Sequence, residues 1–234
     1  RMPSILPPMS REEALETIAE ACTRVTAIVG SPVLTERGAV SAAAVLRKGR
    51  IVDIVEKQYL TARREMGFIV EGEGYKTINI CGQNVAIMVG NDLAHLSEID
   101  SKIDFVINVN SRRYGKGLMS RRLETMRRLS YTQGCSIAII NQVGGSGDLV
   151  YDGTSGILNK QGQIELIMKS FEEDFAIYDT SIEHTPIEIP YTSYNDRTRL
   201  VYKAACLGLR DYFLKNGYKK ACVGLSGGID SSVV

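Results

Sequence analysis

Apolar residues recur along this chain with two different periods. Residues 11–24, 117–133 and 197–215 repeat apolar side chains at the three- and four-residue spacing of amphipathic helices. Shorter apolar runs between turn-forming residues predict strands at 26–30, 42–46, 51–55, 76–80, 85–89, 104–109 and 136–141. Short turns at 47–50 and 81–84 join pairs of these strands as hairpins. Because hairpins mix with long helices, we predict an α+β fold with helix-covered sheets.

Polar residues mark where the predicted helices begin and end. Ser10 and Glu13 form a capping box, Gly134 ends the second helix, and Asn216-Gly217 ends the third. The apolar stripe of the second helix is Leu118, Leu123, Met126 and Leu129. The pattern favours a solvated or partner-facing side over an anion site for its arginines: Arg121, Arg122, Arg127 and Arg128. The apolar side of the third helix is Leu200, Val201, Ala204, Leu207, Leu209 and Phe213.

A change in composition near residue 180 predicts a domain boundary. Pro186, Pro190 and several small polar residues make 181–196 a linker. We therefore expect a first domain over 1–180 and the start of a second over 197–234. A strand beginning near Ala221 is expected to lead into the last motif of the chain.

Charge and cysteine content narrow the class of protein. The 28 basic and 27 acidic residues give a net charge of +1, which offers no electrostatic basis for binding nucleic acid. No apolar run approaches the roughly 20 residues of a membrane span, and the first residues lack the apolar core of a signal peptide. The five cysteines are widely spaced and form no C-x-x-C pair. We expect a cytoplasmic protein with reduced thiols and no membrane or nucleic-acid partner.

The last motif, Ser226-Gly227-Gly228-Ile229-Asp230-Ser231, is typical of a phosphate site. Glycines after an apolar segment let backbone N–H groups point inward together, and a helix start adds partial positive charge. Asp230 can cap that helix or hold a metal ion. The spacing differs from the Walker loop. It resembles the S-G-G-x-D-S pyrophosphate loop of enzymes that adenylate an oxygen with ATP before ammonia displaces AMP.

Four segments together resemble one family. Residues 141–145 with 148–155 are similar to the late strand and loop of a nitrilase-type amidase domain, and 171–173 to the segment that closes it. Residues 207–212, followed by 224–231, are similar to the entrance of a synthetase domain. In this order, the segments resemble the glutamine-dependent NAD synthetases.

This resemblance implies a two-part enzyme. Residues 1–180 would be a nitrilase-like four-layer α-β-β-α sandwich, a glutamine amidotransferase domain lacking its first segment. Residues 197–234 would begin an α/β ATP-binding domain, in which Ser226, Gly227, Gly228, Asp230 and Ser231 cradle the pyrophosphate of ATP. Asp230 would also hold Mg²⁺. Ammonia released from glutamine would pass through a tunnel to amidate nicotinic acid adenine dinucleotide, and a homo-oligomer is expected.

The family's Glu-Lys-Cys triad is incomplete in this sequence. Lys57 matches the catalytic lysine, but Gly90 stands at the position of the nucleophile and has no side chain. Cys81 is either a displaced nucleophile or part of a hairpin turn. The triad glutamate is expected on a preceding segment, and Glu65 and Glu71 are weak candidates for a second carboxylate.

Two further residues and two alternatives stay open. Tyr114 and Lys116 either belong to a loop over the amide pocket or form a solvated turn. Gly90 favours an ammonia-dependent synthetase with an inactive amidase domain, and a non-catalytic oligomerisation scaffold is the second alternative. In each case we expect this chain alone not to hydrolyse glutamine.

Overall fold

The computed structural model describes residues 10–60, 69–99, 101–188 and 197–233. Its first half contains α1 (Arg11–Ala21), β1 (Thr26–Thr35), β2 (Gly38–Arg47), β3 (Arg50–Glu56), β4 (Thr77–Ile80), β5 (Gln83–Val89) and the 3₁₀ segment η1 (Gly90–Glu98). Its second half contains β6 (Phe105–Asn110), α2 (Leu118–Gln133), β7 (Ser136–Asn141), β8 (Val143–Ser146), β9 (Leu149–Asp152), β10 (Gly156–Leu158), β11 (Ile164–Ile167), α4 (Arg197–Lys215) and α5 (Ile229–Val233).

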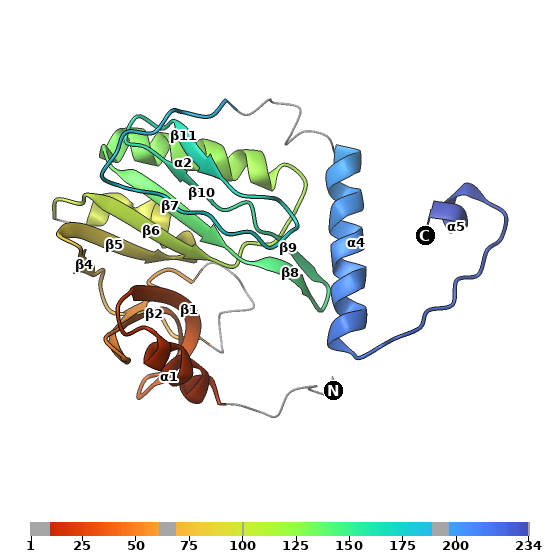
Figure 1. Ribbon diagram of the computed structural model, residues 1–234, viewed down its shortest axis with the longest axis horizontal. Helices are drawn as coiled ribbons and strands as arrows, with labels where there is room; N and C mark the ends of the chain where they lie inside the picture. The colour runs from red at the N-terminus through yellow and green to blue at the C-terminus, as the bar shows by residue number, and fades with distance from the viewer. Residues whose placement is uncertain (1–9, 61–68, 100, 189–196, 234) are drawn as a thin grey trace.

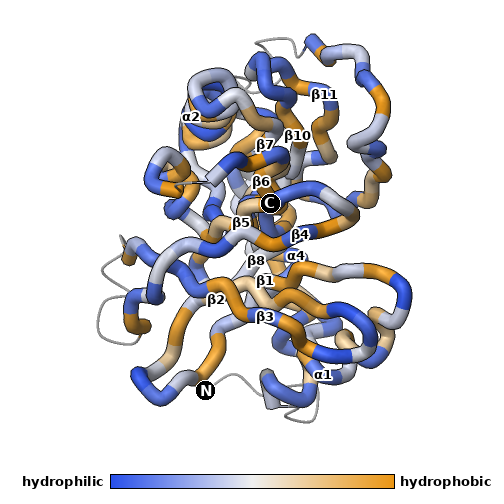
Figure 2. Tube along the Cα trace, turned by 90° about the vertical axis from the view of Figure 1, so that its left-hand side faces the viewer, coloured by the Kyte–Doolittle hydropathy of each residue, from blue (hydrophilic) through white to orange (hydrophobic). Residues whose placement is uncertain are grey.

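Two sheets form the centre of the fold. The smaller sheet has three strands in the order β1-β2-β3, and the larger sheet has six strands in the order β11-β10-β7-β6-β5-β4. The layers follow one another as α1, the smaller sheet, the larger sheet, and α2 with η1 (Figures 1 and 2). This arrangement confirms the predicted α+β fold with an α-β-β-α order. Nearly continuous apolar strands fit it, because both faces of a central strand are covered.

Strand β2 shows how the sequence produces this layering. Its side chains alternate, so Ala44 and Leu46 pack under α1 while Ala43 and Val45 face the larger sheet. All four are completely buried. Small alanines on both faces allow the layers on each side to approach closely.

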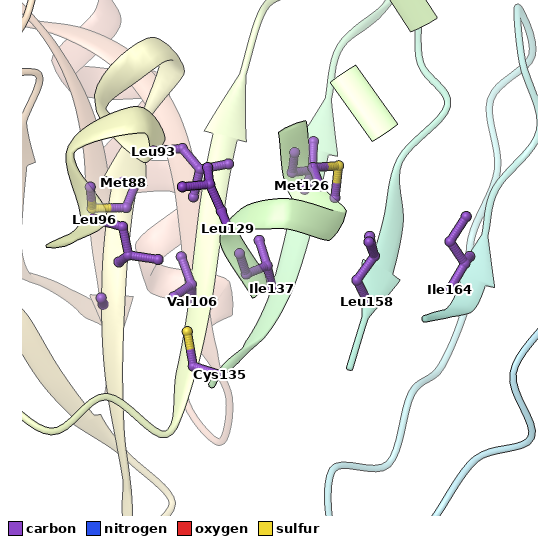
Figure 3. Close-up of a cluster of buried hydrophobic side chains, with 12 residues drawn as sticks. Met88, Leu93, Leu96, Val106, Met126, Leu129, Cys135, Ile137, Leu158 and Ile164 are labelled. Atoms are coloured by element: carbon purple, nitrogen blue, oxygen red, sulfur yellow. The ribbon is translucent and has the colours of Figure 1, made fainter. Parts of the chain in front are cut away.

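Strand β5 repeats this alternation one layer further out. Val85, Ile87 and Val89 face the smaller sheet, whereas Met88 packs with Leu96 of η1 in the outer core. Figure 3 shows that outer core, where side chains from η1, α2 and the strands meet over one face of the larger sheet. Burial of these side chains holds the ends of the central strands in fixed positions.

The centre of the larger sheet is parallel. Strands β5, β6 and β7 run in the same direction, with β4 and β10 antiparallel at their flanks. The carboxyl ends of the three parallel strands therefore meet at one edge, which gathers Gly90, Asn110 and Asn141. This edge carries the candidate site.

Most predicted elements form, and the misses have physical reasons. All of the strands predicted up to residue 141 are present, the Ser10–Glu13 capping box forms, and α2 ends at Gly134. Strands β8 to β11 and the segment η1 were not predicted. The four strands have only three or four residues each, and in β8 and β10 the residues Gly144, Gly145 and Gly156 interrupt the apolar pattern that marks a strand.

Three details of the helices and the last strand were predicted wrongly. Leu118 is 38% exposed, and Arg122, expected on the solvated side of α2, is 5% exposed. Val201 and Leu209 of α4 are also exposed. The strand expected near Ala221 does not form, because no described residue supplies a neighbouring strand for 219–226 to pair with.

Helix α4 packs on the β8–β9 hairpin (Figure 1). Leu200, Ala204 and Leu207 join Met119 and Phe171 in one buried cluster. At the other end of the contact, Asp211 Oδ2 accepts a hydrogen bond of 2.7 Å from the backbone N–H of Gly145. The division into 1–180, 181–196 and 197–234 stays a prediction, and 189–196 lies outside the described residues.

Candidate functional site

The structure brings Lys57 and Gly90 together. Lys57 directly follows β3 of the smaller sheet, and Gly90 directly follows β5 of the larger one. A Cβ atom built on Gly90 would lie 3.4 Å from Cε and 3.6 Å from Nζ of Lys57. Lys57 is only 5% exposed. Its ammonium group therefore lies inside the protein, next to Gly90.

Asp92 ties these two chain segments to each other. It is 1% exposed, and its two carboxylate oxygens accept backbone hydrogen bonds from Gln58 (2.8 Å) and Tyr59 (3.0 Å). Burial raises the pKa of Asp92, although those two bonds and the charge of Lys57 act in the opposite direction. Through these bonds, Asp92 holds the segment after Lys57 against the first turn of η1.

Asparagines fill the neighbouring strand ends. Asn108 donates from Nδ2 to the carbonyl oxygens of Met88 and Gly90, both at 3.2 Å, and accepts a hydrogen bond from Asn110. The backbone of Gly90, with φ of +61°, is thus held by the strand beside it. A residue with a side chain rarely adopts that conformation, whereas glycine does so at little cost.

A buried ion pair closes another side of the site. Arg122 Nη2 lies 2.6 Å from Asp152 Oδ2, and Asp152 Oδ1 accepts a bond of 3.0 Å from Asn141. Burial raises the pKa of Asp152, opposed chiefly by the charge of Arg122. Asn141 Oδ1 also accepts from the backbone N–H of Arg112 at 2.8 Å, which fixes the start of the loop after β6.

These groups surround a cavity of about 810 Å³. Lys57 and Gly90 lie on its wall, together with uncharged polar residues such as Ser41, Asn110 and Thr125. Four arginines complete the polar lining: Arg112, Arg113, Arg121 and Arg122. None of the described residues that line the cavity is a cysteine or a carboxylic acid.

Cys81 lies away from this cavity. It is exposed and occupies the turn between β4 and β5 with φ of +51°. Gly90 is at the opposite end of β5, roughly 20 Å away along a strand of this length. The geometry favours the hairpin-turn interpretation of Cys81 over a displaced nucleophile.

Tyr114 and Lys116 are also outside the cavity lining formed by the described residues. The Tyr114 ring packs edge-on against Phe171 at 5.1 Å, next to the α4 cluster, and its backbone N–H donates to Val150. Lys116 is exposed. Of the two weak carboxylate candidates, Glu71 is exposed, and Glu65 falls outside the described residues.

The 226–231 motif forms a compact exposed turn far along the chain from this cavity (Figure 1). The hydroxyl groups of Ser226 and Ser231 lie 3.0 Å apart, and Ser231 Oγ donates to the carbonyl of Gly228. Gly227 has φ of +81°, and the helix α5 begins at Ile229. Asp230 is exposed in the first turn of α5.

The sequence pattern did not predict the site roles of Asp92, Asp152 and Arg112, or the burial of Arg122. One signal was present for Arg122, because it falls on the helical stripe of Met119, Met126 and Leu129. A charged residue on an apolar stripe predicts a buried partner. Nothing in the local sequence pointed to Asp92, whose partners precede it by more than thirty residues.

Comparison with known proteins finds relatives among the glutamine-dependent NAD synthetases. The NAD synthase family model matches residues 201–234. The glutamine-dependent NAD(+) synthetase of Xanthomonas campestris pv. campestris is 29% identical over 95% of this chain and 43% of its own length. The chain therefore spans about two fifths of the length of such relatives.

Solved structures agree with the sequence comparison. A glutamine-dependent NAD+ synthetase from Acinetobacter baumannii, solved with adenosine diphosphate, superposes with a TM-score of 0.80 at 26% identity, over 94% of this chain and 44% of its own. A CN-hydrolase superfamily protein from Xanthomonas campestris gives a TM-score of 0.60 at 16% identity, over 83% and 74%, which supports the fold alone. In sequence and in fold, the chain is related to the glutamine-dependent NAD synthetases, with a nitrilase-like sandwich followed by a segment that matches NAD synthase.

Proposed function

We propose that this chain is part of an ATP-driven carbon–nitrogen ligase that amidates nicotinic acid adenine dinucleotide to NAD with nitrogen from glutamine. The observation that carries the proposal is the pairing of two features in one chain. A nitrilase-like sandwich brings Lys57 beside position 90, and an S-G-G-x-D-S turn follows in a segment that matches NAD synthase. Relatives that match over most of this chain are glutamine-dependent NAD synthetases.

The 226–231 turn has the donors that an ATP pyrophosphate needs. Backbone N–H groups of Gly227 and Gly228, with the hydroxyls of Ser226 and Ser231, would hold phosphate oxygens. Asp230 would hold Mg²⁺ together with those oxygens, which fits a hard cation bound through one carboxylate plus substrate phosphates. The described residues contain no group of three or more acidic, histidine or cysteine side chains that would bind the ion alone. ATP would supply the activation of the substrate carboxyl group.

The amide site differs from the chemistry that the resemblance implies, because the position of the nucleophile is Gly90. Lys57 is positioned to stabilise a developing oxyanion. No thiol faces it, because position 90 is glycine and no described cavity residue is a cysteine. The absence of a described thiol beside Lys57 favours the second candidate, a synthetase that uses free ammonia and has an inactive amidase domain. The relatives favour the glutamine-dependent enzyme.

One assay separates these functions. The complete protein that contains this chain is supplied with ATP, Mg²⁺ and nicotinic acid adenine dinucleotide, with either glutamine or ammonium as nitrogen donor, and NAD and glutamate are measured. NAD formation with both donors supports the main proposal, and NAD from ammonium alone supports the second candidate. Failure with both donors would contradict each of them.

Two accompanying proposals concern the surroundings of the enzyme. No helix in the described part of the chain has the length and hydrophobicity that a membrane crossing requires. We also propose that the protein is cytoplasmic and that it forms homo-oligomers. Size-exclusion chromatography with light scattering tests the second point.

A further inference from the structure

We propose that Tyr59, His95 and Glu98 are positioning residues that hold Lys57 at its place beside Gly90. The proposal rests on the role that the proposed function gives to Lys57, whose ammonium group would stabilise an oxyanion. It is carried by the spacing of polar residues along η1, by the contacts that they make with Tyr59, and by the different sheets to which Lys57 and Gly90 belong.

The segment η1 has one polar face and one apolar face. Asp92, His95 and Glu98 follow one another at intervals of three residues. A 3₁₀ helix has about three residues per turn, so these side chains share one face. Leu93 and Leu96 point into the outer core (Figure 3). The apolar face therefore fixes η1 on the larger sheet, and the polar face meets the segment that follows β3.

The polar face of η1 holds both the ring and the backbone of Tyr59. The rings of Tyr59 and His95 stack with centroids 3.6 Å apart and planes 16° from parallel. Glu98 joins the two rings, because Oε2 accepts a bond of 2.8 Å from the Tyr59 hydroxyl and Oε1 lies 2.7 Å from His95 Nδ1. Hydrogen bonds from His95 and from Tyr59 lower the pKa of Glu98, so its carboxylate is charged at neutral pH. Asp92 accepts the backbone N–H of Tyr59 at 3.0 Å.

These contacts join the two sheets next to the candidate site. Lys57 directly follows β3 of the smaller sheet, and its backbone N–H donates to the carbonyl of Ser41 in β2 at 2.7 Å. Gly90 directly follows β5 of the larger sheet and opens η1. Tyr59 and His95 come shortly after these two positions, so their stack bridges the sheets. A shift of one sheet past the other at this end would separate the rings and move Lys57 away from Gly90.

A thiol introduced by Gly90→Cys reports on the distance to Lys57 without any turnover. In the complete protein, alkylation of that thiol by iodoacetamide is followed against pH, alone and combined with Tyr59→Leu or Tyr59→Phe. Because a nearby cation lowers the pKa of a thiol, Tyr59→Leu should move the midpoint of alkylation up by about one pH unit. Tyr59→Phe keeps the stacked ring and loses only the hydroxyl bond, so its effect should be clearly smaller.

Acetylation of Lys57 supplies a second measurement, with glycine kept at position 90. Acetic anhydride labelling is followed by mass spectrometry, and the rate at Lys57 is divided by the rate at exposed Lys219. Tyr59→Leu should raise this ratio about fivefold, the effect of losing one net hydrogen bond from the closed arrangement. Glu98→Ala should act in the same direction and keeps the test available if Tyr59→Leu does not fold. Glu124→Ala, at an exposed position on α2, should leave the ratio unchanged.

A stack with a purely structural role gives a different result. The free energy of unfolding of Tyr59→Leu would then fall, while the thiol profile and the acetylation ratio of Lys57 stay as in the parent protein. That outcome would overturn the proposal, as would equal acetylation ratios in Glu98→Ala and Glu124→Ala. Neither measurement uses ATP or glutamine, so a failed synthetase assay would count against the proposed function and leave the positioning result intact.

Discussion

Gly90 combines a backbone that favours glycine with room for a larger residue. Its φ of +61° costs a residue with a side chain about 1–2 kcal/mol, yet the nearest atoms to a built Cβ leave ordinary contact distances. There is therefore room for a side chain at position 90, but the backbone conformation there disfavours residues other than glycine. A small side chain can be introduced there as a probe of Lys57.

Gly90→Cys should place a thiol beside the Lys57 ammonium and lower the pKa of that thiol. The variant should fold, with a loss of about 1–2 kcal/mol in the free energy of unfolding. Alkylation by iodoacetamide, followed against pH by mass spectrometry, measures the effect, and exposed Cys81 in the same sample is the internal control. Addition of Lys57→Met should return the new thiol to ordinary reactivity. Equal pH profiles at positions 81 and 90 would contradict the placement of Lys57.

Asp92 should give stability a distinct pH dependence. Its pKa is raised from 3.8 in the folded protein, chiefly by burial. Between the pKa of Asp92 in the unfolded chain and its raised pKa in the folded protein, the folded state keeps a proton that the unfolded chain has released. The contribution of Asp92 to stability therefore falls as pH rises through this range. Asp92→Asn should remove this contribution to the slope. Denaturant unfolding of both proteins between about pH 4 and 6 checks it, and parallel slopes would contradict the raised pKa.

At the scale of elements, the Asp211–Gly145 hydrogen bond fastens α4 to β8. A Cβ on Gly145 would lie 3.1 Å from Gly208 Cα, so the helix and the hairpin approach as closely as two backbones allow. Lys215 adds a second bond, from its ammonium group to the carbonyl of Gly145. The contact depends on small residues and two charged side chains.

Asp211→Ala should loosen this contact. The buried N–H of Gly145 would lose its partner, at a cost of about 1–3 kcal/mol. Hydrogen exchange should speed up in α4 and at Gly145, while the amides of β5 and β6 keep their rates. Lys219→Ala, at an exposed position beyond the helix, is the matched control. Unchanged exchange in α4 would show that the apolar cluster alone holds it.

Elements with a strong local period could be predicted, and contacts between distant segments could not. Helix α1 and strands β2 and β5 carry runs long enough to show their period. Strand β10 has three residues, and η1 follows from packing under α2 rather than from a pattern of its own. At the site, Lys57 and position 90 were predicted from a resemblance. Asp92 and Asp152 were missed because their roles depend on partners brought together only by the fold.

At the scale of the whole molecule, the proposed ligase depends on the 226–231 turn. Asp230→Ala in the complete protein should abolish NAD formation with either nitrogen donor, because Mg²⁺ and the pyrophosphate would lose their carboxylate partner. Glu124→Ala, at an exposed position on α2, should leave NAD formation unchanged. Normal ammonia-dependent synthesis by Asp230→Ala would refute the assignment of this turn.

Helix α4 lies in the segment that matches NAD synthase, yet it is seated on the sandwich. The match to NAD synthase therefore begins within a helix that packs on the sandwich. Residues 218–225, which join the helix to the 226–231 turn, are exposed and form no helix or strand. Because α4 is held on the sandwich, the proposed ATP-binding turn would change its distance from the amide cavity through rearrangement of 218–225, with α4 staying in place.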